Sequence, residues 1–140
     1  MAKYQKIAVA IDFSEQSKKA LERGVNLARD YDATLQLIHV VDTVSFGSIA
    51  AYDLKYAEKL KTQSLSEIVK FKQEAEAQGV NRVEVTVEEG SAKSILTQLK
   101  DVDLIICGAT GYNAIEKMVI GSVAEQVART AKCDVLIVRL

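Results

Sequence analysis

The sequence predicts an α/β protein with an open five-stranded parallel sheet, strand order 3-2-1-4-5, and helices on both faces. Segments with a strand pattern alternate with helical segments along the whole chain, which favours parallel strands joined by crossover helices. The first and fourth strand segments are apolar without interruption, so we place them in the centre of the sheet. The third alternates apolar and polar residues, so we place it at an edge.

The first strand is predicted at Lys6 to Ile11, and a helical pattern follows it through Ala28. Ser14 is well suited to be the N-cap of that helix. The second strand is predicted at Thr34 to Val41. The segment from Asp42 to Ala51 mixes small and apolar residues, and we interpret it as a loop that could serve as a mobile lid.

A long amphipathic helix is predicted from Asp53 to Gln78, because apolar residues recur there at helical spacing. Gly79 follows it as a C-cap glycine would. The third strand is predicted at Arg82 to Glu88. Gly90 and Ser91 then lead into a short helix.

The fourth strand is predicted at Asp103 to Cys107, the last helix at Ser122 to Thr130 and the fifth strand at Val135 to Leu140. The fifth strand is apolar and would lie at the far edge of the sheet. An exposed edge of that kind invites pairing with a second chain, so we expect a homodimer through this strand. A helix covering the edge is the alternative.

Composition restricts the class of protein. The chain has 140 residues, of which 49% are hydrophobic and 26% charged, which is typical of one globular domain spanning residues 1–140. The net charge of −1 argues against a nucleic-acid partner. We find no apolar run long enough to span a bilayer and no signal peptide, so we expect a cytoplasmic protein without a membrane partner. Cys107 and Cys133 are expected to be buried free thiols.

The predicted strand order has its topological switch point between the first and fourth strands, and ligands of open α/β sheets bind outside the carboxyl ends of strands at such a point. Those two ends carry Asp12 and Gly108, which are far apart in the sequence. The carboxylate of Asp12 could accept a hydrogen bond from a ribose hydroxyl or hold Mg²⁺ beside a triphosphate. The alternative is that Asp12 caps the following helix.

A glycine-containing stretch follows the fourth strand. Gly108 and Gly111 are separated by two residues, and Gly121, directly before Ser122, follows after nine more. We interpret strand, glycine loop and helix as a phosphate cradle, in which glycine permits positive φ and close approach of N–H groups to an anion. The alternatives are ordinary strand-end and turn glycines, with Ser122 as an N-cap. The P-loop lysine and the Gly-x-Gly start of a dinucleotide fingerprint are both absent.

At these residues the chain resembles the nucleotide-binding branch of the universal stress protein family, whose pattern is glycine, two residues, glycine, nine residues, glycine, then serine or threonine. The resemblance extends over nearly the whole chain, through KIAVAIDFSEQSKKAL, LQLIHVVD and GSVAEQVARTAKCDVLIVRL. It implies a Rossmann-like fold, ATP with Mg²⁺ as ligands, and a homodimer. Matched by position, it implies Asp12 as the metal ligand and nucleotide contacts from Ala10, Asp12, Val41, Cys107, Gly108, Gly111, Gly121, Ser122, Val123 and Ala124.

We therefore expect an ATP-binding stress-response protein that acts as a nucleotide-responsive switch. Nucleotide would order the loops at Asp42 to Ala51 and Gly111 to Ile120, and a protein partner that the sequence leaves unknown would read the change. One alternative is slow ATP hydrolysis or phosphoryl transfer in the same site, although the sequence offers no evident base or arginine clamp. Another is a dimeric interaction module that binds no nucleotide, a branch of the family that the N-terminal half resembles.

Three further polar residues near these segments have simple interpretations. His39, the only histidine, is interpreted as a hydrogen-bonded core residue of the second strand rather than a general base. Asp42 could be a second magnesium ligand, but a solvated loop carboxylate is the simpler interpretation. Lys117 could reach a phosphate as a point charge, and a solvated lysine is again simpler. We predict no catalytic residues.

Overall fold

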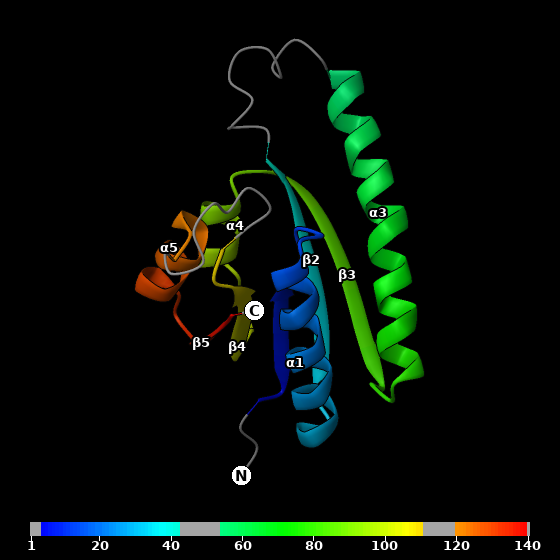
Figure 1. Ribbon diagram of the computed structural model, residues 1–140, viewed down its shortest axis with the longest axis vertical. Coiled ribbons are helices and arrows are strands. Elements are labelled where there is room, and N and C mark those ends of the chain that lie inside the picture. The colour runs from blue at the N-terminus through cyan, green and yellow to red at the C-terminus, as the bar shows by residue number, and fades with distance from the viewer. Residues whose placement is uncertain (1–3, 43–53, 111–119, 140) are drawn as a thin grey trace.

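The five strands form one parallel sheet in the order β3-β2-β1-β4-β5, which confirms the predicted topology (Figure 1). The computed structural model describes residues 4–42, 54–110 and 120–139. The strands are β1 (Lys6–Ala10), β2 (Thr34–Asp42), β3 (Arg82–Gly90), β4 (Leu104–Gly108) and β5 (Asp134–Val138). The helices are α1 (Glu15–Tyr31), α3 (Leu54–Ala77), α4 (Ala92–Thr97) and α5 (Ser122–Thr130).

Helices cover both faces of the sheet because alternate residues of the central strands point to opposite sides. Ile7, Val9 and Ile106 belong to the core cluster that packs against α1 and α3. Ala8 and Ile105 belong to the second cluster, which packs against α4 and α5 (Figure 1). The unbroken apolar runs in β1 and β4 therefore reflect burial on both faces.

The alternation in β3 also has its predicted cause, because β3 lies at an edge of the sheet. Its valines pack against the cluster under α3. On the other face, Glu84 forms an ion pair with Lys6 at 3.2 Å, and Thr86 accepts a hydrogen bond from Nε2 of Gln36 at 3.2 Å. Polar pairs thus occupy the face of β3 that points away from α3.

The second strand is longer than the first, and this difference shapes the end of the sheet where ligands are expected. The pairing of β1 with β2 ends at Ala10 opposite Ile38. Beyond that point β2 continues beside β3 as far as Asp42, which pairs with Gly90. Val41 therefore lies three residues past the end of β1, a rise of roughly 10 Å along the strand. The carboxyl end of β2 forms a wall that projects beyond β1.

The helix ends agree with the predicted capping residues. Ser14 is the N-cap of α1, and its side chain accepts a hydrogen bond from the backbone N–H of Ser17 at 3.2 Å. Gly79, just after α3, has a φ of 103°, a left-handed conformation that favours glycine. None of the helices in the described residues is both long enough and apolar enough to cross a membrane.

Candidate functional site

Backbone hydrogen bonds and a histidine join the carboxyl ends of β1 and β2. The N–H of Ile11 donates to the carbonyl of Ile38 at 2.7 Å, and Nδ1 of His39 lies 2.6 Å from the carbonyl oxygen of Ile11. A carbonyl oxygen can only accept, so Nδ1 carries the hydrogen in this contact. The ring of His39 also contacts that of Phe13, with centroids 4.7 Å apart. The predicted hydrogen bond of His39 is confirmed, but the residue is only partly buried and does not belong to the core.

Asp12 follows β1 and is exposed, as the predicted ligand site requires. Its Oδ1 accepts hydrogen bonds from the backbone N–H of Ser14, at 2.9 Å, and from Oγ of Ser14. Asp12 is therefore not the N-cap of α1, but it accepts hydrogen bonds from Ser14, which is the N-cap. Within the described residues its Oδ2 has no hydrogen-bond partner, so only Oδ1 supports the helix start.

Gly108 ends β4 directly beside the start of α1. A Cβ added there would lie 2.8 Å from Cβ of Gln16, which is closer than real Cβ atoms approach, and a tight 3.3 Å from the backbone oxygen of Thr110. The left-handed glycines among the described residues are Gly79 and Gly90, and Gly121 has a φ of −65°. The expectation that positive φ explains the glycines is therefore wrong for Gly108 and Gly121. Close approach of α1 explains Gly108.

Gln16 and Thr110 were not predicted from the sequence, although they connect the start of α1 to the segment after β4. Nε2 of Gln16 donates to Oγ1 of Thr110, and the backbone N–H of Thr110 donates to Oε1 of Gln16 at 2.7 Å. Both residues are only 8% exposed. One signal could have revealed Gln16: it shares a helical face with Ala20, Gly24 and Ala28, which are buried against the sheet. A polar residue on that apolar face requires a partner.

The start of α5 is fixed to the end of β4 by the backbone. The N–H of Gly121 donates to the carbonyl of Ala109 at 2.6 Å. Gly121 is the N-cap of α5, and no side chain in the described part of the chain caps the helix, so the alternative that Ser122 is the N-cap is wrong. Ser122 is exposed at the first helical position. The N–H groups of Ser122, Val123 and Ala124 have no acceptor within the helix, because the carbonyls four residues earlier lie outside it.

The remaining predicted residues have buried or partly buried side chains, so a ligand contact from them would have to come from the backbone. Val41 is 5% exposed and Cys107 is 4% exposed, so their side chains belong to the core. Ala10, the last residue of β1, is half-buried. The side chain of Ala124 is buried, which leaves its N–H at the helix start as the group that could meet a ligand. Gly111, Lys117 and most of the two predicted mobile loops lie outside the described residues.

Both cysteines are free thiols, but only Cys107 is buried as expected, and Cys133 is partly exposed. Burial raises the pKa of the Cys107 thiol from its ordinary value of 9.0 to about 11. The thiol therefore contributes stability that is fully present below pH 9 and is lost as the pH rises to about 11, because the unfolded chain releases its proton first. Between pH 9 and about 11, we expect the free energy of unfolding of the native protein to fall by roughly 2 to 3 kcal/mol more than that of Cys107→Ala. Urea unfolding at a series of pH values measures the difference. The pKa values of Tyr4 and Cys133 are also raised, but both proteins contain these residues, so their contributions cancel in the difference. A constant difference between the two proteins would contradict the prediction.

Metal binding by protein groups alone has little support in the described part of the chain, which contains no cluster of three or more His, Cys, Asp or Glu residues suited to a metal ion. Asp42 lies at the end of β2, opposite Gly90 on β3. Mg²⁺ commonly takes one or two protein carboxylates together with water and substrate phosphates. Asp12 fits that mode of binding, in which the nucleotide supplies the other oxygens.

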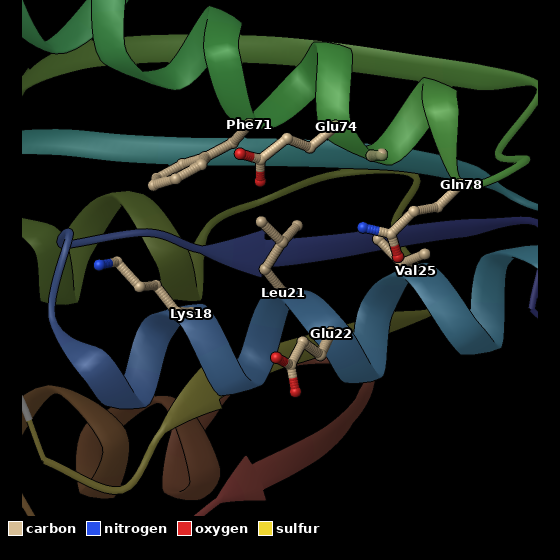
Figure 2. Close-up of a pocket in the computed structure, with 8 residues that line it drawn as sticks. Lys18, Leu21, Glu22, Val25, Phe71, Glu74 and Gln78 are labelled. Carbon is tan, nitrogen blue, oxygen red and sulfur yellow. The ribbon is translucent and has the colours of Figure 1, made fainter.

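A groove of about 310 Å³ lies elsewhere, between α1 and α3 (Figure 2). Leu21 projects from α1 into the gap toward α3, and charged side chains stand around it (Figure 2). None of the predicted site residues lines this groove, whose lining consists of Lys18, Leu21, Glu22, Val25, Phe71, Glu74, Ala75 and Gln78. The groove is thus separate from the carboxyl ends of β1 and β4, where the predicted site residues lie.

Comparison with known proteins places the chain among relatives of one kind. Residues 3–139 match the Universal stress protein family. A Staphylococcus saprophyticus protein named for that family is 37% identical over 143 residues, which cover 99% of this chain and 86% of the relative. The structure of universal stress protein UspA from Lactobacillus plantarum superposes with a TM-score of 0.87 at 23% identity and covers 99% of this chain and 100% of its own. A universal stress protein in complex with cAMP superposes with a TM-score of 0.74 at 26% identity, covering 98% of each chain.

Proposed function

We propose that this chain, which belongs to the universal stress protein family, binds ATP at the carboxyl ends of β1 and β4 and acts as a nucleotide-responsive switch in stress response. The observation that carries the proposal is the backbone tie between Ala109 and Gly121, which sets the open N-terminus of α5 at the topological switch point of the sheet. Unpaired N–H groups and the positive end of the helix dipole favour a phosphate there. The related structure with cAMP supports a nucleotide as the ligand.

Each described residue of the proposed site has a chemical role. Ser122 would donate its hydroxyl to a phosphate, because α5 does not use it as a cap. The free Oδ2 of Asp12 would accept from a ribose hydroxyl or hold Mg²⁺ against the phosphates. Val41 would offer backbone groups to the adenine, from the part of β2 that projects past β1. The wall formed by β2 gives the base a surface to lie against.

The two ends of the nucleotide would lie on different elements, and this arrangement suits a switch. The phosphates would meet α5, which follows β4, while the base meets β2. Bound ATP would therefore bridge the ends of β2 and β4, two strands that are not neighbours in the sheet. Ligand binding at such a bridge favours one relative arrangement of the segments over others. The open edge of β5, whose central residues are only half-buried, supports a homodimer as the form in which the switch acts.

Calorimetric titration of ATP with Mg²⁺ into protein freed of nucleotide tests the proposal. We expect saturable binding near one ATP per chain, weaker binding of AMP, and weaker binding of GTP, since the triphosphate contacts α5 and the adenine contacts β2. Omitting Mg²⁺ should weaken ATP more than AMP, because the metal would act through the phosphates. Absence of heat together with an unchanged melting temperature at millimolar ATP would overturn nucleotide binding and favour the dimeric interaction module.

A further inference from the structure

We infer that Gln16 is a positioning residue for the phosphate end of the proposed nucleotide site. By holding Thr110 it fixes the segment after β4, and through that segment it sets the place of the start of α5. This inference rests on the proposed ATP site, but Gln16 itself need not touch the nucleotide. Its effect would be on the part of the affinity that the phosphates supply.

The contact between Gln16 and Thr110 uses both ends of one amide group. The side-chain N–H of Gln16 meets the hydroxyl of Thr110, and its oxygen receives the backbone N–H of the same residue at 2.7 Å. Two bonds to one residue fix its orientation as well as its distance. Both residues are buried, so losing the amide would leave the N–H of Thr110 without a partner and away from water.

The backbone carries this restraint from Thr110 to α5. Ala109, the preceding residue, receives the N–H of Gly121 at 2.6 Å and donates its own N–H to the carbonyl of Val138 at 2.8 Å. The segment of Ala109 and Thr110 is therefore tied to α1, β5 and α5 at once. If Thr110 moved, the carbonyl that holds Gly121 would move with it, and the N–H groups proposed to bind phosphate would follow.

The close packing at Gly108 strengthens the restraint. A Cβ at this position would lie 2.8 Å from Cβ of Gln16 and 3.3 Å from its carbonyl carbon, so the start of α1 lies directly against the end of β4. This close approach fixes where the side chain of Gln16 begins relative to the end of β4. Ligand-binding groups need support of this kind, because displacements near 0.5 Å already weaken a site.

A second glutamine and threonine pair provides a matched control. Nε2 of Gln36 on β2 donates to Oγ1 of Thr86 on β3 at 3.2 Å, and both residues are half-buried. Gln36 lies opposite Ala8 in the middle of the sheet, five residues before Val41. Gln36→Met removes a similar hydrogen bond in a region that carries no proposed phosphate contact.

The experiment compares ATP and adenosine binding to folded protein. Gln16→Met keeps the length of the side chain without its hydrogen bonds, and Thr110→Val keeps the shape of threonine without its hydroxyl. We expect Gln16→Met to weaken binding of ATP with Mg²⁺ by about tenfold, as loss of supporting contacts commonly does, while adenosine affinity changes by less than about twofold. Calorimetry measures ATP, chemical-shift titration measures adenosine, and thermal unfolding defines a temperature at which each variant is folded.

Four further results separate positioning from a purely structural role. Thr110→Val should weaken ATP selectively, and Thr110→Ser, which restores the hydroxyl, should recover the native ratio of ATP to adenosine affinity. Gln16→Met combined with Thr110→Val should weaken ATP less than the two separate losses predict, because both break one contact. Gln36→Met should lower stability and leave the ratio unchanged.

The outcomes distinguish this inference from the proposed function. If the native protein binds ATP and Gln16→Met leaves the ratio of affinities unchanged, positioning by Gln16 is wrong while the ATP site stands. An equal change of the ratio in Gln36→Met would also overturn the inference, since it would reflect general destabilisation. If the native protein binds no ATP, the proposed function fails first, and the inference fails with it.

Discussion

Replacing Gly121 by aspartate is expected to weaken ATP binding by roughly 100-fold or more, because a fixed carboxylate beside the phosphates adds like-charge repulsion of several kcal/mol. Gly121 is the N-cap of α5, with φ −65° and ψ 159°. That extended conformation is open to any L-residue, and aspartate is among the preferred N-caps, so the substitution should not harm the helix. Calorimetric titration with ATP and Mg²⁺ measures the loss.

Gly121→Asn is the matched control, because asparagine has the size and capping ability of aspartate without its charge. If the phosphates lie at the start of α5, the asparagine variant should bind ATP more tightly than the aspartate variant by at least about tenfold. Thermal unfolding should show both variants folded. Equal ATP affinities in the native protein and Gly121→Asp would remove α5 from the proposed site.

Gly24→Val is expected to lower the free energy of unfolding by about 3 kcal/mol, at the upper end of the range for overpacked cores. A Cβ at Gly24 would lie 2.6 Å from Cγ2 of Val9 and 3.2 Å from Cδ1 of Leu35. Both partners are fully buried, and the sheet beneath them has neighbours on both sides. Helix α1 must therefore move outward, which would also disturb Gln16 at its start. Urea unfolding measures the change.

Arg23→Val is the control for this prediction, because it places the same β-branched residue one position earlier on the exposed side of α1. It should change stability by only about 0.5 kcal/mol, mainly through helix propensity. Adding Val9→Ala to Gly24→Val should recover part of the lost stability by making space at the shortest contact. A Gly24→Val protein as stable as the native one would contradict the close packing of α1 on β1.

The sheet order could be predicted because the way each strand is buried determines which of its residues are apolar. Val83, Val85 and Val87 alternate with polar residues, and β3 does lie at an edge, with its polar residues on the face away from α3. The run from Leu104 to Cys107 is apolar throughout, and β4 is buried on both faces. Each pattern depends only on residues of its own strand, so a single sequence contains it.

The candidate site was predictable only in outline. Strand order alone places Asp12 and Gly108 at neighbouring strand ends, and the structure confirms that placement. Binding of ATP or Mg²⁺ by these residues stays a prediction. The contact of Gln16 with Thr110 joins residues 94 positions apart, and its only local trace is a polar side chain on the buried face of α1. That trace shows that a partner is needed without naming it.

The sequence by itself therefore determined the order of the elements, the strands that lie in the centre and at the edges, and the end of the sheet where a ligand is expected. Only the tertiary structure decided that residue 108 must be glycine because α1 lies against it, and that Gly121 rather than Ser122 caps α5. It also decided that Oδ1 of Asp12 accepts a hydrogen bond from Ser14. The physical reason is that periodicity reports how each segment is buried, whereas these details depend on distances between atoms that meet only after the segments have packed.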